Sequence, residues 1–279
     1  MKQIFNRATK LSFSTDNEIK DYYWVLGEKK KPPLLLLHGY TGNHNDLLSV
    51  AESLREKYFV IVPDLPGWGK SPRFKKDLSI ENYALYLKTL LDSLGINKIT
   101  LVGHCMGTAV CIELAVRFPN LVEQLFLVST PYISGTMSEN VFLHLANITQ
   151  KSPKKIRRVF FIWRSRFFTT PLSFYILKVH SIRKKINLIM HYIKIQPSQQ
   201  EDAVEENFFS GIHYNYDKVK KIQVPIHLIH GSNDVIIGRN DAVKFHELIP
   251  SSTLEFIPHS GHIPPIESPQ SMASLILKY

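Results

Sequence analysis

The sequence predicts an α/β protein in which a mostly parallel β-sheet is covered by helices on both faces. Continuous apolar, β-rich runs alternate with segments of three- and four-residue apolar spacing through the first 130 residues, and the alternation resumes at residue 224. Strands that are buried on both faces read as continuous apolar runs, whereas helices repeat their apolar residues every three or four positions. With 279 residues, of which 44% are hydrophobic, the chain can bury a large core.

The expected elements follow one another in a regular order. Strands are expected at 31–39, 57–67, 97–103, 122–130, 224–231 and 252–258. Helices are expected at 46–57, 79–95, 108–118, 240–249 and 269–278. Ser79 is a suitable N-cap for the second of these helices, and Gly95 is a suitable residue to end it, because serine accepts from free helical N–H groups and glycine adopts the left-handed conformation.

Residues 134–212 break this alternation. They read as helical, basic and aromatic, and they lie between two strands of one sheet. We therefore expect a helical, basic lid inserted into a core that is formed by residues 1–133 and 213–279.

The basic excess of the chain lies in this insertion. The net charge is +10, yet twelve Lys and Arg residues and no Asp or Glu lie between Lys151 and Lys194, so the other 235 residues carry a net charge of −2. Trp163 lies there at helical spacing from two phenylalanines, with arginines between them. Three hypotheses stay open: an apolar stripe that lines a pocket beneath solvated charges, contact of 151–194 with an anionic membrane, or recognition of an anionic substrate head group. Nucleic acid is not expected, because no recognised binding fold accompanies the charge.

Targeting signals and cofactor motifs are not found in the sequence. The N-terminal residues lack the apolar stretch of a signal peptide, and no apolar run approaches the roughly 18 residues of a membrane span. The two cysteines, Cys105 and Cys111, are six residues apart on one predicted turn and helix, which is poor geometry for a disulfide. A cytoplasmic protein is expected, peripheral to a membrane if the basic segment binds one. With no metal-ligand cluster and no dinucleotide loop, neither a metal nor another cofactor is expected.

The segment Gly103–His104–Cys105–Met106–Gly107 lies between a predicted strand and a predicted helix. A sharp strand-to-helix turn can expose one side chain above the end of a sheet, and it requires glycine two residues before and two residues after that side chain. The pattern predicts that Cys105 is a nucleophile whose side chain is exposed above the end of the sheet. The alternative is a glycine-flanked thiol packed in the core, since free cysteines are often buried.

Five motifs in this order resemble the α/β-hydrolase superfamily over nearly the full length of the chain. They are HGYTGN (38–43), DLPGWGKS (64–71), GHCMGT (103–108), HGSNDVI (230–236) and SGHIPPIESP (260–269). The closest resemblance is to the lidded esterase, lipase and carbon–carbon hydrolase branch. The elbow of that branch normally carries serine, so Cys105 is a departure, although dienelactone hydrolases and polyhydroxyalkanoate synthases resemble the chain in having G-x-C-x-G. Whether Cys105 is native or replaces a serine stays open.

A nucleophile of this kind needs a base, and the base needs a group that orients it. His262 follows the last strand in Ser-Gly-His, where a loop can return over the sheet edge, and His259 is the nearby alternative. Asp234 follows a strand 28 residues before His262 and is the expected acid, with a turn aspartate as the alternative interpretation. The other strand end used for this acid in some relatives, LVSTPYISG, has no carboxylate.

The resemblance also implies an oxyanion hole and a substrate-binding surface. The expected donors are the backbone N–H of Met106, at the start of a helix, and that of Tyr40. His104 is expected to point away from the nucleophile in a structural role. The residues predicted to border the substrate are His38, Gly39, Trp68, His104 and Trp163, although Trp68 could also serve packing alone.

The sequence thus predicts a hydrolase acting on an ester, thioester or lactone with a hydrophobic acyl chain. The acyl group would be held on Cys105, with His262 as base and Asp234 as orienting acid, and the only partner expected from this reaction is a small-molecule acyl substrate. Two alternatives are an acyltransferase with a cysteine nucleophile and a ligand-binding protein that keeps the fold without turnover.

Overall fold

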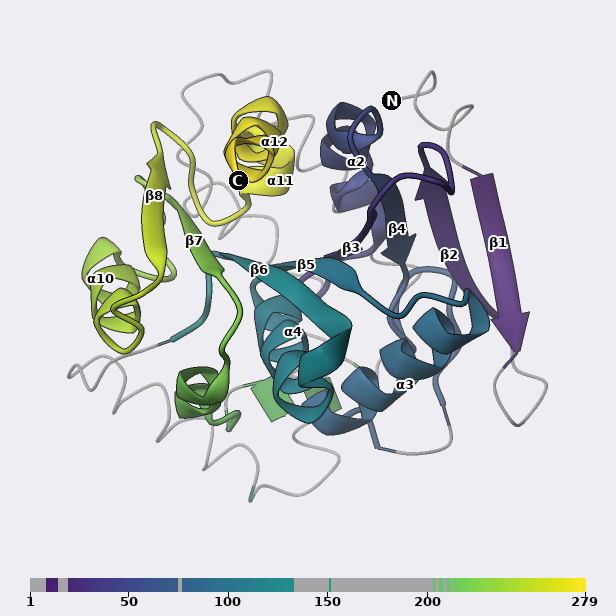
Figure 1. Cartoon of the computed structure of the whole chain (residues 1–279). Helices are drawn as coiled ribbons and strands as arrows, with labels where there is room; N and C mark the ends of the chain where they lie inside the picture. Colours follow the sequence, from purple (N-terminus) through teal and green to yellow (C-terminus); the bar gives the residue numbers. More distant parts are fainter. Residues whose placement is uncertain are drawn as a thin grey trace, which may run out of the picture.

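The computed structural model describes residues 9–14, 20–74, 77–132, 151, 203, 206–207, 210–211 and 213–279. Within this part of the chain, eight strands form one sheet in the order β1-β2-β4-β3-β5-β6-β7-β8 (Figure 1). The predicted α/β class is confirmed. Most of the expected insertion, 134–212, lies outside the described residues, so the division into core and lid stays a prediction.

Continuous apolar runs form the centre of the sheet. The strands are β1 Thr9–Ser14, β2 Lys20–Leu26, β3 Pro33–Leu37, β4 Phe59–Pro63, β5 Ile99–His104, β6 Val122–Val128, β7 Ile226–Gly231 and β8 Thr253–Ile257. The pairs β1–β2 and β2–β4 are antiparallel, whereas every pair from β4 to β8 across the sheet is parallel. Because parallel strands end at the same edge, the loops after β3, β5, β6 and β7 are brought together there.

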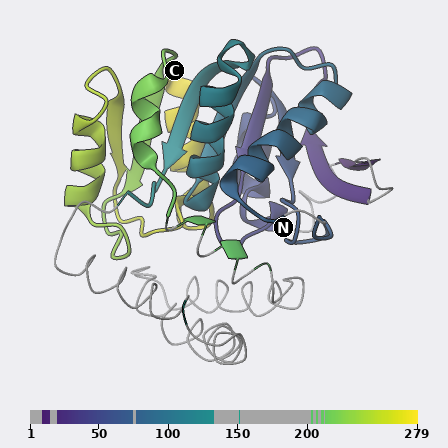
Figure 2. The same cartoon turned by 90° about the horizontal axis from the view of Figure 1, so that it is seen from below.

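Helices cover both faces of the sheet. They are η1 His44–Asp46, α2 Leu48–Leu54, α3 Ile80–Ser93, α4 Met106–Arg117, η2 Pro119–Leu121, η5 Tyr216–Lys221, α10 Arg239–Glu247, α11 Pro264–Glu267 and α12 Pro269–Lys278. The turned view shows α3 (blue) and α4 (teal) in front of the sheet and the yellow C-terminal helices behind it (Figure 2). No helix among the residues that the structure describes has the length and apolar character needed to cross a membrane.

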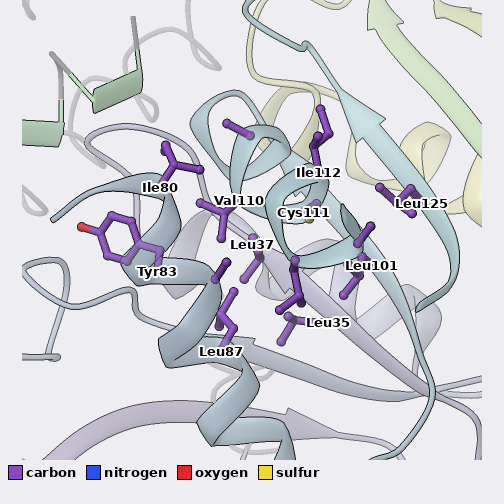
Figure 3. Close-up of a cluster of buried hydrophobic side chains, with 14 of the residues drawn as sticks. Leu35, Leu37, Ile80, Tyr83, Leu87, Leu101, Val110, Cys111, Ile112 and Leu125 are labelled. Atoms are coloured by element: carbon purple, nitrogen blue, oxygen red, sulfur yellow. The ribbon is translucent and has the colours of Figure 1, made fainter. Parts of the chain in front are cut away.

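The alternation of side chains along β3 divides the core into two layers. Leu35 and Leu37 pack with residues of α3 and α4, as Figure 3 shows, whereas Leu34 and Leu36 pack with residues of α2 and α12. Cys111 is fully buried in the α3–α4 layer. This core holds the edge on which the candidate site lies.

The predicted ends of α3 are observed. Ser79 accepts a hydrogen bond from the Asn82 N–H at 3.3 Å, and Gly95 follows the helix with φ +70°. Helix 46–57 is shorter than predicted, because Asn43 caps a 3₁₀ turn at His44–Asp46 and α2 begins only at Leu48.

Candidate active site

The sequence Gly103–His104–Cys105–Met106–Gly107 forms a tight turn between β5 and α4. Cys105 has φ +50° and ψ −120°, a backbone conformation that non-glycine residues rarely adopt. The turn is held on both sides: the Cys105 N–H donates to the Val128 carbonyl at 2.9 Å, and the Cys105 carbonyl accepts from the N–H and the hydroxyl of Thr108 at 2.9 and 2.7 Å. Cys105 is partly exposed, unlike Cys111. The interpretation of Cys105 as a core thiol therefore does not fit.

Both glycines of the elbow are required by close backbone contacts. A Cβ on Gly103 would lie 2.5 Å from the Gly107 carbonyl oxygen, and a Cβ on Gly107 would lie 2.7 Å from the His38 carbonyl oxygen. The first contact lets α4 leave the strand at a sharp angle. The second lets α4 approach β3, and with it the loop after β3.

Gly103→Ala is expected to destabilise the protein by about 1–3 kcal/mol, because the added methyl overpacks a site bounded by rigid backbone. Equilibrium urea unfolding measures this change. Gly211→Ala is the matched control, since a Cβ there would lie at an ordinary contact distance of 3.8 Å from the Met106 Cγ. Equal stability of the two variants would contradict the packing argument.

His262 lies beside Cys105 and Asp234. Its Nδ1 donates to the Asp234 Oδ2 at 2.9 Å, and the Cys105 side chain lies close enough to its ring to raise its pKa. Both His262 and Asp234 are buried. His259, the alternative base, is exposed, and its N–H donates to the Ser232 hydroxyl at 2.9 Å. The structure thus brings the predicted nucleophile, base and acid together.

Asp234 combines the two functions that its sequence position suggested. Its Oδ1 accepts from the N–H groups of Ile236 and Ile237 at 2.9 and 3.0 Å, which is a turn aspartate's pattern. Its Oδ2 remains for the His262 ring. The turn bonds therefore fix the carboxylate in the orientation that meets the histidine.

The charges of this group support an imidazolium on His262. Burial favours the neutral ring, but the Asp234 carboxylate, followed by the charge and hydrogen bond of Cys105, outweighs it and raises the pKa of His262 to about 10. Burial also raises the pKa of Asp234, yet His262 and the hydrogen bonds to the carboxylate leave that pKa below its ordinary value. Asp234 and Cys105 therefore both favour the protonated form of His262.

Two further histidines support the group. The Nε2 of His104 donates to the His262 carbonyl at 2.8 Å, and burial, with the charge of His262, lowers the pKa of His104 to about 4, so its ring is neutral. The structural role predicted for His104 matches this contact. His230 was not predicted: its Nε2 lies 2.9 Å from the Ile237 carbonyl and 3.4 Å from the Asp234 Oδ2. Only its place at the end of an apolar strand could have indicated it.

The loop after β3 lies directly against the elbow. A Cβ on Gly39 would be 2.9 Å from the Cys105 Cβ and 2.9 Å from the His104 Nδ1, so the peptide that carries the Tyr40 N–H starts beside the Cys105 side chain. Met106 is the first residue of α4, where N–H groups have no intrahelical acceptor. The two predicted oxyanion donors therefore flank Cys105, and their role stays a prediction.

His38 and Trp68, two of the other residues predicted to border the substrate, make hydrogen bonds within the neighbouring loop, and whether they also border the substrate stays a prediction. The Leu65 N–H donates to the His38 Nε2 at 3.1 Å, and the His38 Nδ1 lies 2.9 Å from the Gly39 carbonyl. Trp68 is fully buried and donates its ring N–H to the Tyr83 hydroxyl at 3.1 Å. Both contacts shape the loop that borders the elbow. Trp163 lies outside the described residues, and so does the basic stretch after Lys151.

The described residues contain no group of three or more His, Cys, Asp or Glu side chains that could hold a metal ion. The described groups at this edge of the sheet are a thiol, an imidazole, a carboxylate and backbone N–H donors.

Residues 32–269 match the family described as the alpha/beta hydrolase fold. The chain belongs to this family. It is therefore an α/β hydrolase, and the tight turn at Cys105 lies where this fold places its nucleophile elbow, while the role of Cys105 as the nucleophile stays a prediction. This agrees with the resemblance seen in its five motifs, although serine in place of cysteine is the usual elbow residue of the esterase branch.

Individual relatives are distant but cover the chain almost completely. An uncharacterized protein of Mycobacterium tuberculosis (strain ATCC 25618 / H37Rv) is 25% identical over 96% of this chain and 80% of its own length. Lipase 3 of Moraxella sp. (strain TA144) is 26% identical over 87% of this chain and 75% of its own length. Among solved structures, carboxylesterase CesB of Bacillus subtilis matches with a TM-score of 0.75 at 20% identity, covering 100% of this chain and 94% of the other.

Proposed function

We propose that this α/β hydrolase cleaves a carboxylic ester, thioester or lactone with a hydrophobic acyl chain through a covalent acyl-enzyme on Cys105. The observation that carries the proposal is the His262 ring, whose Nδ1 donates to the Asp234 carboxylate and whose pKa is raised by both Asp234 and the nearby Cys105 side chain. A base oriented by a carboxylate and in contact with a nucleophile on a strained elbow is the arrangement that acyl transfer requires. The lipase among the relatives supports the choice of an ester bond.

The proposed acylation begins with the Cys105 thiolate beside the His262 imidazolium. The sulfur attacks the acyl carbonyl carbon, and the oxyanion that forms lies between the N–H groups of Tyr40 and Met106. As the carbon–oxygen bond breaks, His262 gives its proton to the departing alkoxide. The result is a thioester on Cys105, a free alcohol and a neutral His262.

Deacylation reverses the role of the histidine. Neutral His262 accepts a proton from water while the water oxygen attacks the thioester carbonyl, and the acid product leaves as the thiolate is restored beside the imidazolium. An alcohol or thiol could take the place of water here, since thioesters react readily with such acceptors. Transfer to such an acceptor is the second reaction that the same site supports.

Apolar side chains beside the acid support a hydrophobic acyl chain. Val235 and Ile236 directly follow Asp234 and have 38% and 47% of their surface exposed. Large apolar side chains exposed next to a catalytic group favour contact with an apolar ligand. Apart from Lys151, the segment 151–194 for which membrane contact is predicted lies outside the described residues. That contact stays a prediction that sedimentation with anionic and with neutral vesicles tests.

We expect release of nitrophenol from p-nitrophenyl esters, with a rate that rises from acetyl to medium acyl chains and falls once the chain exceeds the pocket. Trapping with a slow substrate, followed by peptide mass spectrometry, should find the acyl group on Cys105. Added glycerol or a thiol separates hydrolysis from transfer by the product formed. Turnover with no acyl group on Cys105, or no turnover with any ester, thioester or lactone, would contradict the proposal.

A further inference from the structure

We propose that Glu267 is a positioning residue of this enzyme. Its carboxylate fixes the backbone on both sides of His262 and so holds the imidazole in place over Cys105. The inference rests on the proposed function in so far as His262 is taken as the base. It adds a second, partly buried carboxylate to the site, one that contacts the backbone of the two neighbours of the base and not its ring.

Both carboxylate oxygens of Glu267 accept a backbone hydrogen bond. The Gly261 N–H donates to Oε2 at 2.8 Å, and the Ile263 N–H donates to Oε1 at 2.8 Å. These are the two residues that flank His262. Hydrogen bonds to an ionised group are shorter and stronger than those between neutral groups, so one side chain fixes the loop at two successive points around the base.

The local sequence directs the carboxylate to this place. The N–H groups of Ile266 and Glu267 donate to the Ile263 carbonyl at 3.0 and 2.9 Å, and this short turn folds Glu267 back onto the loop. Pro264 and Pro265 have no N–H, so Ile263 carries the last backbone donor of the loop before Ile266. The spacing of five residues between His262 and Glu267 is thus set by one turn of α11.

Other contacts limit the loop in the remaining directions. A Cβ on Gly231, at the end of β7, would overlap the Gly261 carbonyl and lie 2.5 Å from the Ser260 carbonyl oxygen, so the loop already touches the sheet. His104 holds the His262 carbonyl at 2.8 Å. These contacts restrain the carbonyl groups of the loop. Glu267 restrains the N–H groups of the same peptide units.

The charge of Glu267 also interacts with the charges of Asp234 and His262. Burial, together with the charge of Asp234, raises the pKa of Glu267 above its ordinary value, although its two backbone hydrogen bonds and His262 oppose this. The interaction with His262 is mutual, so an ionised Glu267 favours the imidazolium. Loss of the charge is therefore expected to weaken the thiolate–imidazolium pair as well as the position of the base.

Glu267→Gln tests the inference, because glutamine keeps the length but loses the charge and one of the two acceptors. The first measurement is alkylation of Cys105 by iodoacetamide against pH, followed by peptide mass spectrometry, which needs no ester substrate. The second is kcat and KM for p-nitrophenyl esters. Glu255→Gln is the matched control, since Glu255 lies on β8 and pairs with the exposed Lys278, away from the site.

We expect Glu267→Gln to lower kcat by roughly 10- to 100-fold with KM nearly unchanged, because misplacement of a catalytic group by about 1 Å costs up to 10²-fold in rate. The pH of half-maximal alkylation should rise in this variant and stay in place in the control. Glu267→Asp keeps the charge on a shorter side chain, and it should recover the alkylation profile more fully than kcat. It also serves as the test if the glutamine variant does not fold.

A wild-type kcat and alkylation profile in Glu267→Gln, with only a lower melting temperature, would overturn the inference and leave Glu267 as a brace of the fold. A shifted alkylation profile in a protein that hydrolyses no ester would support the inference while contradicting the proposed function. A lowered kcat with an unchanged profile in both Glu267 variants would overturn the electrostatic part alone.

Discussion

Cys105→Ala is expected to lower kcat for ester hydrolysis by roughly 10⁴-fold or more, since removal of the nucleophile from a comparable triad costs about 10⁶-fold. The alanine variant keeps the oxyanion donors and the binding surface, so KM or ligand affinity should change little. Initial rates of nitrophenol release, measured with the same ester for both proteins, give the comparison.

Cys111→Ala is the matched control, because it removes the other thiol of the chain. Cys111 is fully buried in the core, and burial raises the pKa of its thiol above the ordinary value, so it does not act as a nucleophile. We expect its kcat within about two-fold of wild type. Equal rates of the wild type and Cys105→Ala would show that the ester is cleaved without this cysteine and would remove the proposed mechanism.

Cys105→Ser distinguishes a thiolate mechanism from a serine-like one. A serine hydroxyl does not form a stable alkoxide beside His262, so its attack needs a neutral imidazole as base. The activity of Cys105→Ser should therefore rise as pH increases toward the pKa of His262. Wild type should instead hold its activity on alkyl esters over the pH range in which the imidazolium is present. Identical pH profiles would contradict the ion pair.

The parts of the fold that the sequence predicts correctly are those whose cause is local. The central strands are continuous apolar runs, and the elbow depends on two glycines whose spacing is visible in the sequence. Strands β1 and β2 were not assigned to residue ranges, because Thr9–Ser14 and Lys20–Leu26 mix polar and apolar residues and no continuous apolar run marks them. Their antiparallel pairing at one end of the sheet supplies the stabilisation that their composition does not.

The site shows the same division between local and non-local causes. Cys105, Asp234 and His262 could be predicted because each lies in a short motif at the end of a strand. His230 could not, since its contact with Asp234 depends on how the turn after β7 folds back over that strand. Glu267 looks in the sequence like a surface carboxylate between Ile266 and Ser268, and only the folded loop shows that it accepts from both neighbours of His262.

Asp234→Asn is expected to lower kcat by roughly 10³- to 10⁴-fold, as the same change does in a Ser-His-Asp triad. The asparagine Oδ1 can still accept from the N–H groups of Ile236 and Ile237, so the turn should persist. Its amide nitrogen would face the His262 Nδ1, which must then accept a hydrogen bond. The proton moves to the other ring nitrogen, and the base no longer faces the nucleophile in its active tautomer.

The pH dependence of the same variant gives a second and independent measurement. The imidazolium of His262 is lost as pH rises through its pKa, which is about 10 in the wild type and should fall when the Asp234 charge is removed. An alkoxide leaving group needs that proton, so the decline of activity at high pH should move to lower pH with ethyl esters. Nitrophenolate leaves without a proton, so p-nitrophenyl esters should show no such decline.

Asp92→Asn is the control for this pair of measurements. Asp92 is exposed on α3, and among the described residues its carboxylate forms an ion pair with Lys88. Wild-type rates and an unchanged profile in Asp234→Asn would mean that Asp234 only shapes the turn after β7. A lower kcat, together with a high-pH decline that moves to lower pH for ethyl esters alone, would identify Asp234 as the group that orients His262 and stabilises its charge. A purely structural loss would affect ethyl and p-nitrophenyl esters alike.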